Sequence, residues 1–119
     1  MAYVDGFVIP VPKKNLKTYR RISQRAGKIW REHGALEYRE CVGDDLNLKS
    51  GASFVRAARA KRGEAVVFSW IVYRSRSHRD SVNKKVMKDP RIAKMMNDSA
   101  PIFDFKRMVY GGFKVIVDV

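Results

Sequence analysis

A strand that runs almost directly into a helix restricts the fold of this chain more than any other feature. Residues 66–73 read VVFSWIVY, mostly apolar on both faces of the expected strand, and a serine-capped helix follows at 75–80. A strand joined so closely to a helix is typical of half a β-α-β crossover. A strand over 2–10, followed by a helix that Pro12 opens, supplies a second such unit in the first third of the chain.

The first helix is amphipathic. Its apolar side chains recur at steps of three and four residues, which places them in one stripe along a helix. The stripe consists of Leu16, Tyr19, Ile22, Ala26, Ile29 and Trp30, and lysines and arginines fill the opposite side. His33 and Gly34 follow the stripe, where a cation and a glycine both favour the end of a helix.

The later elements are indicated by periodicity and by breaker residues. The expected elements are a strand over 35–42, a short helical turn around 54–60, a strand over 65–73, a helix from Ser75 or Ser77 to about Asp89, a short turn over 91–96 and a strand over 107–117. Pro90 breaks the second long helix, because proline cannot continue a helix from within. The turn is expected because a structureless loop over 43–64 would be unusually long.

This order, β-α-β-β-α-β, predicts an α+β fold with a ferredoxin-like subunit, formed by one domain over residues 1–119. We expect an antiparallel-type sheet of four strands that carries both helices on one face. Within it, the first and third strands should lie side by side and parallel. Because the third strand is apolar on both faces, we expect a second copy to cover the bare face, in a homodimer packed sheet to sheet.

Charge is the unusual property of the composition. The chain has 25 lysines and arginines against 12 aspartates and glutamates, a formal net charge of +13, and most of these cations lie in the two expected helices. Cys41 is the only cysteine, which excludes an intrachain disulfide, favours a reducing compartment and suggests a small buried residue. The first residues do not resemble a signal peptide and no apolar run is long enough to span a membrane, so we expect a cytoplasmic protein.

Five segments together resemble the bacterial YbaA-like proteins, a domain of unknown function placed with the dimeric α+β barrels. The segments are YVDGFVxPVP at 3–12, WxEHGALEY at 30–38, FSWIVY at 68–73, HRDxVNxKVMxDPR at 78–91 and KRMxYGGF at 106–113. The resemblance covers nearly the whole chain and implies a homodimer of ferredoxin-like subunits, with no established activity. Val55 departs from the pattern, in which proline is common, and the chain is more basic than the family pattern predicts.

The wider superfamily of dimeric α+β barrels includes cofactor-independent oxygenases, small-molecule isomerases and haem-degrading enzymes. The resemblance extends to this superfamily at the level of fold, and a shared fold does not carry one chemistry. From the sequence itself no cofactor is expected and no metal site is indicated, because His, Cys and carboxylate residues lack the spacing of a ligand set.

Three polar residues, His78, Arg79 and Asn83, fall on the inward side of the second helix, close to Tyr73. One interpretation is that they pair with one another, with strand ends or with Glu40, as buried polar groups must. The other is that they line a ligand cleft between sheet and helices, where His78 is the candidate general base. The catalytic residues, if the protein is an enzyme, are not identified by the sequence.

A second candidate site is an anion-binding site. If both helices begin at the same end of the sheet, Lys13 and Lys14 meet Arg74 and Arg76 there, together with free helix N–H groups that could bind phosphate or carboxylate. The competing interpretation is a solvated charged rim. The same parallel arrangement would separate His33 from His78 by roughly 20 Å.

Two functions are therefore open. The first is binding of a small molecule in a cleft between the sheet and the helices. In one version of this hypothesis the ligand is an anion, and in another the protein is a cofactor-independent enzyme. The alternative is binding of RNA or another polyanion through the basic helical face. Against the alternative, Tyr19 and Trp30 point inward, and the third strand lacks the glycine- and aromatic-rich signature of RNA-recognition modules.

Overall fold

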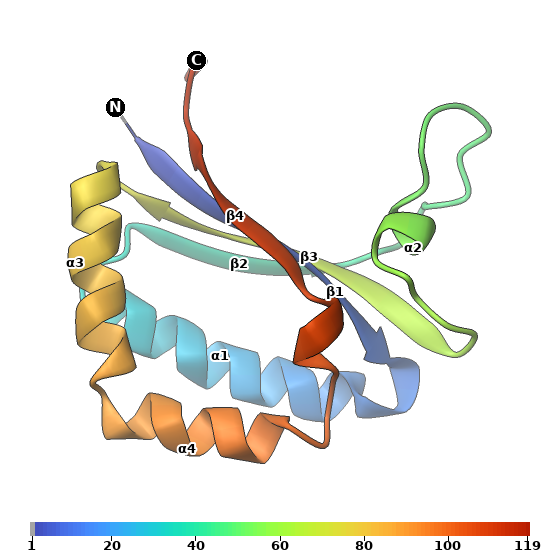
Figure 1. Ribbon diagram of the computed structural model, residues 1–119, viewed down its shortest axis with the longest axis horizontal. Coiled ribbons are helices and arrows are strands. Elements are labelled where there is room, and N and C mark those ends of the chain that lie inside the picture. The colour runs from blue at the N-terminus through green and yellow to red at the C-terminus, as the bar shows by residue number, and fades with distance from the viewer. Residues whose placement is uncertain (1) are drawn as a thin grey trace.

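The computed structural model describes residues 2–119 as one four-stranded antiparallel sheet with the three longer helices packed on one face (Figure 1). The elements are β1 (Tyr3–Pro12), α1 (Leu16–Glu32), β2 (Glu37–Val42), α2 (Phe54–Ala57), β3 (Glu64–Tyr73), α3 (Arg76–Met87), α4 (Pro90–Ser99) and β4 (Val109–Lys114), with 3-10 turns at Lys13–Asn15 and Phe105–Arg107. This arrangement confirms the predicted α+β, ferredoxin-like fold. No helix within the described residues combines the length and apolarity that crossing a membrane requires.

The strand order is β2-β3-β1-β4, and every neighbouring pair is antiparallel. The expectation that the first and third strands are parallel is wrong: β1 pairs with β3 from Tyr3 opposite Tyr73 to Pro12 opposite Glu64. The reason lies in β2, which runs in the same direction as β1 and antiparallel to its neighbour β3. Consequently α1 and α3 begin at opposite ends of the sheet.

The helix boundaries follow from local capping. The Ser75 hydroxyl accepts a hydrogen bond from the His78 N–H at 3.1 Å and so begins α3. The Asp89 carboxylate caps α4 with Pro90 at its first position, so the expected short turn over 91–96 is a ten-residue helix instead. Gly34, with φ +116°, ends α1 in the left-handed region that glycine tolerates best.

The last strand is shorter than the sequence predicts. Residues 105–107 form a 3-10 turn instead, because Asp104 caps it and Arg107 is held in an ion pair with Glu64 at 2.7 Å. That guanidinium lowers the pKa of Glu64 to about 2. The ion pair fastens the chain just before β4 to the start of β3.

The core lies between the inner sheet face and the helices. Tyr3 and Ile9 of β1, and Val82 and Val86 of α3, are buried there. On the outer sheet face, Phe54 of α2 lies 6.2 Å from Phe68 between ring centres, but within the described residues the face stays largely open: Phe68, Val109 and Phe113 are 45%, 55% and 62% exposed. The expected burial of Cys41 is wrong as well, because β2 is an edge strand and its cysteine is exposed.

We predict that Gly27→Ala destabilises the protein even though alanine favours a helix by about 1 kcal/mol. A Cβ at this position would lie 2.7 Å from Cδ1 of the Tyr38 ring, and overpacking of this kind costs about 1–3 kcal/mol. Urea unfolding measures the change, with Lys28→Ala on the neighbouring exposed position as the control. An equal or higher free energy of unfolding for Gly27→Ala would contradict the close contact.

Candidate functional site

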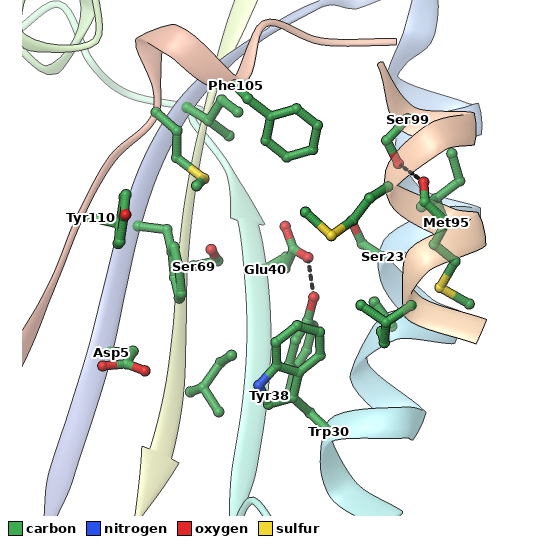
Figure 2. A pocket seen from close by; sticks show the side chains of 18 of the residues that line it. Asp5, Ser23, Trp30, Tyr38, Glu40, Ser69, Met95, Ser99, Phe105 and Tyr110 are labelled. Atoms are coloured by element: carbon green, nitrogen blue, oxygen red, sulfur yellow. Dashed lines mark hydrogen bonds between the residues drawn. The ribbon is translucent and has the colours of Figure 1, made fainter. Parts of the chain in front are cut away.

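A cavity of about 470 Å³ lies between the inner face of the sheet and helices α1, α3 and α4 (Figure 2). Its volume falls within the ~300–1,000 Å³ typical of ligand pockets. The wall is mostly apolar, and its aromatic rings and methionine thioethers include Phe7, Trp30, Phe103, Met87, Met95 and Met108. Two groups of polar side chains interrupt this apolar wall.

The first polar group is centred on Glu40 of β2. Its carboxylate accepts one hydrogen bond from the Tyr38 hydroxyl at 2.7 Å and a second, short one from the Tyr19 hydroxyl of α1. Burial and the neighbouring carboxylate hold the pKa of both tyrosines well above the usual value, so both remain donors. Figure 2 shows Glu40 among the side chains that line the cavity, with its bond to Tyr38 dashed.

The second polar group joins β1 to α3. The Arg79 guanidinium donates to the Asp5 carboxylate at 2.9 Å and lies 4.9 Å from the centre of the Tyr3 ring. The Asn83 carbonyl oxygen accepts from the Trp30 indole N–H and from the Tyr73 hydroxyl, both at 3.2 Å. Burial raises the pKa of Asp5, and the nearby Arg79, Asn83 and Tyr73 only partly offset this effect.

The two polar groups stand on different strands. Glu40 lies opposite Ser69 of β3, and Asp5 lies opposite Ile71 of the same strand, so β3 separates the carboxylates by two strand spacings, about 10 Å across the sheet. The Ser69 side chain projects from this central strand among the residues that line the cavity (Figure 2). Such a wall can orient a mostly apolar molecule through polar contacts at two separate points.

The structure brings together three of the four predicted ligand residues. Arg79 and Asn83 line the cavity, and Tyr73, which is fully buried, supports Asn83 from behind. His78 is directed elsewhere: its Nδ1 accepts from the Arg74 N–H at 3.0 Å, and its ring packs edge-on against Tyr73. Burial, with the nearby Arg74 charge, lowers the pKa of His78. The geometry therefore gives His78 a structural place at the start of α3.

The estimated separation of His33 from His78 is wrong. His78 packs against Gly34, the residue after His33, because α1 ends at the same end of the sheet where α3 begins. The His33 ring itself contacts Asp89 at 2.9 Å. In residues 2–119 no three His, Cys, Asp or Glu side chains are placed to hold a metal ion together.

The predicted anion cluster is not assembled either. Lys13 and Lys14 follow the end of β1, whereas Arg74 and Arg76 follow the end of β3. Since these strands pair antiparallel over ten residues, the two pairs of cations lie about 30 Å apart along the sheet. The prediction failed because it assumed that β1 and β3 are parallel, which would place the starts of α1 and α3 at the same end of the sheet.

Some residues of the cavity escaped the sequence analysis. Asp5 and Ser69 are polar residues at inward positions of strands whose other inward residues are mostly apolar. Because every second residue of a strand faces the same side, a polar residue in this series could have indicated both positions. Glu40 was considered only as a partner for other groups. Glu37, three residues earlier on β2, lies on the opposite face of the sheet.

The architecture defines the chain as a ferredoxin-like α+β protein with a sheet–helix cavity, and solved structures share it. It is similar to an uncharacterized NIPSNAP domain protein from Burkholderia xenovorans, with a TM-score of 0.58 and 14% identity over 95% of this chain and 93% of that one. It is also similar to SnoaB, a cofactor-independent oxygenase from Streptomyces nogalater, with a TM-score of 0.64 and 8% identity over 99% and 96%. Identities this low show the fold alone.

The sequence comparisons are more specific. The family described as "Protein of unknown function (DUF1428)" matches residues 2–105. The chain is 45% identical over 118 residues to the uncharacterized protein YbaA of Escherichia coli strain K12, covering 99% of both chains. The chain belongs to the DUF1428 family, which confirms the predicted YbaA-like resemblance.

We predict opposite pH dependences for Asp5→Asn and Glu64→Gln. The pKa of Asp5 lies above its usual 3.8 in the folded state, so its contribution to stability is greatest below pH 3.8 and is lost as the pH rises through the raised pKa. The pKa of Glu64 is lowered from 4.5 to about 2, so its contribution is present above pH 4.5 and is lost as the pH falls toward 2.

The measurement is the free energy of unfolding across pH for the wild type and each variant. Relative to Asp5→Asn, the wild type should lose stability as the pH rises above 3.8. Relative to Glu64→Gln, it should gain stability between about pH 2 and pH 4.5. Equal slopes in the two comparisons would show that the two carboxylates are not held in these contrasting environments.

Proposed function

We propose that this protein is a homodimer that binds a small, largely apolar molecule in the sheet–helix cavity. The observation that carries the proposal is the Glu40 carboxylate in an apolar and aromatic wall, held by the hydroxyls of Tyr19 and Tyr38. A carboxylate has about four acceptor positions, and the two tyrosines use two of them. The remaining positions are available to a hydrogen-bond donor on the ligand.

The second polar group would orient the other end of the ligand. Arg79 and Asn83 line the cavity and are themselves fixed by Asp5, Trp30 and Tyr73, so they offer preformed rather than adaptable contacts. Preformed polar groups favour binding because little side-chain entropy remains to be lost. They are two of the four residues that the sequence suggested for a ligand site; Tyr73 supports Asn83 from behind, and His78 is directed elsewhere.

An enzymatic form of the proposal requires chemistry without a cofactor. SnoaB, whose fold is similar, is a cofactor-independent oxygenase. In the present cavity the groups able to take a proton from a bound molecule are Glu40 and Asp5. The single cysteine supports placing this activity in the cytoplasm.

The homodimer is supported by the outer sheet face. Phe68 and Trp70 of β3 pack together at 5.5 Å between ring centres, and the exposed Val109 and Phe113 of β4 lie on the same face, on the other side of β1. Contiguous apolar faces of this kind mark interaction surfaces. A second copy presents the same face, and sheets pack face to face at about 10 Å.

We predict that N-phenyl-1-naphthylamine, a neutral fluorescent probe of apolar sites, binds in the cavity and that Ser69→Phe, which fills it, reduces the signal at least severalfold. Phe68→Ser is the matched control, because it alters the neighbouring residue of β3 on the opposite face. Fluorescence titration of both variants measures the effect, and urea unfolding confirms that both remain folded. A signal lost in Phe68→Ser but kept in Ser69→Phe would place the probe on the outer face and overturn cavity binding.

A second candidate function, binding of RNA or another polyanion, has one observation in its favour. Of the 25 lysines and arginines, only Arg39, Arg79, Arg91 and Arg107 form ion pairs among the described residues. The exposed cations of α1 therefore form no ion pairs with other described residues. Phosphate contacts made by such residues release counterions and bind in a salt-dependent manner.

If α1 binds single-stranded RNA, replacing Arg21, Arg25 and Lys28 with glutamine should lower the salt slope of log K by about 2, or about 0.7 for each lost phosphate contact. Glutamine at Lys84 and Lys85 of α3 and at Lys88, which caps the end of that helix, is the control of equal charge. Binding of a labelled oligonucleotide across a salt series measures both slopes. Equal losses in the two variants would indicate general attraction to net charge and would contradict a site on α1.

A further inference from the structure

One of the charged residues that line the cavity has no ion-pair partner. Asp5 is paired with Arg79 at 2.9 Å, and Arg39, at the edge of the lining, is paired with Glu37 at 2.8 Å. Glu40 is the remaining charged residue of the lining, and its side-chain contacts are the two tyrosine hydroxyls. Glu40 is therefore the one charged residue of the lining that forms no ion pair among the described residues, so no neighbouring cation balances its charge.

A carboxylate without an ion-pair partner is unexpected in so basic a protein. With 25 lysines and arginines in the chain, a partner for one carboxylate would be easy to supply. Arg20, Lys28 and Arg31 line the neighbouring groove between α1 and β2, which also reaches Glu40, yet none of them lies within ion-pair distance of its carboxylate. A carboxylate in an apolar wall is costly unless a cation or hydrogen-bond donors compensate it.

The surrounding surface is suited to a cation. The faces of Trp30 and Tyr38 lie close together near Glu40, with ring centres 6.0 Å apart, and Phe7 and Tyr110 stack at 6.2 Å across the cavity wall. Aromatic faces attract ammonium groups, most strongly where water is excluded. The same faces and the methionines also accept an apolar body of varied shape.

We propose that the ligand of this cavity is a protonated amine with an apolar, ring-sized body, whose ammonium group donates to Glu40. The ammonium has three donors, and it would complete the hydrogen bonding of a carboxylate that already accepts two phenol hydroxyls. A carboxylate ligand would be repelled from the same point, and an alcohol would gain a hydrogen bond without the charge. This assignment rests on the cavity binding proposed above and specifies its ligand class.

Three probes with one indole body separate charge from shape: tryptamine, tryptophol and indole-3-acetate. The amine of tryptamine is protonated at pH 7, since alkylamines of this kind titrate near the lysine value of about 10.4. Isothermal titration calorimetry should give the order tryptamine, tryptophol, indole-3-acetate, with the amine bound at least about tenfold more tightly than the acid. Glu40→Gln should reduce this ratio to near one.

Glu37→Gln is the matched control, because Glu37 lies on the same strand as Glu40 but on the opposite face of the sheet. It should leave the order and the ratio unchanged, and Tyr38→Phe should weaken the amine preference only in part. Equal affinities, a preference for the acid, or binding of none of the three probes would overturn the amine assignment. Cavity binding itself is tested separately by the neutral naphthylamine probe and Ser69→Phe, so the two failures are distinguishable.

Discussion

The antiparallel ladder between β1 and β3 determines where every other part of the molecule lies. It extends over ten residues of each strand and forms the centre of the sheet. Because the two strands run in opposite directions, the helices that follow them run in opposite directions as well. The end of α1 therefore meets the start of α3, and α3 can present Arg79 and Asn83 to the strand that carries Asp5.

The cavity exists because the core is divided. One apolar cluster lies around Tyr73, Val82 and Val86, and a second lies around Ile9, Val11 and Tyr19. Between them the wall carries Asp5, Ser69 and Glu40, whose short polar side chains do not fill the space that leucine or phenylalanine would. The hydrogen bonds to these groups keep their burial tolerable, since a buried polar group without a partner costs about 1–3 kcal/mol.

Much of the fold could be predicted from the sequence because its signals are local. Helical periodicity located α1, Pro90 located the break before α4, and the apolar run over 66–73 located β3. The direction of β3 relative to β1 could not be read in this way, because it depends on pairing between residues about 60 positions apart. Because this direction was predicted wrongly, the predicted distance between His33 and His78 and the predicted anion cluster were wrong as well.

The candidate site was predictable in the same uneven way. Arg79 and Asn83 stood out as polar residues on the inward face of a helix, and both line the cavity. Glu40 could not be singled out, since its significance comes from a tyrosine of α1, 21 positions earlier, and from the lack of a cation within reach. A missing partner is a property of three-dimensional packing and leaves no mark on spacing or composition.

The methionines of the cavity wall have a consequence for how selective this protein can be. Met87, Met95 and Met96 contribute unbranched side chains with three rotatable bonds each, so they can adapt to a guest by changing rotamer while the backbone stays in place. Glu40, in contrast, is fixed from two elements at once. Such a wall tolerates variation in the outline of a molecule far better than variation in its charge, and this is the behaviour of a receptor for a chemical class rather than for one compound.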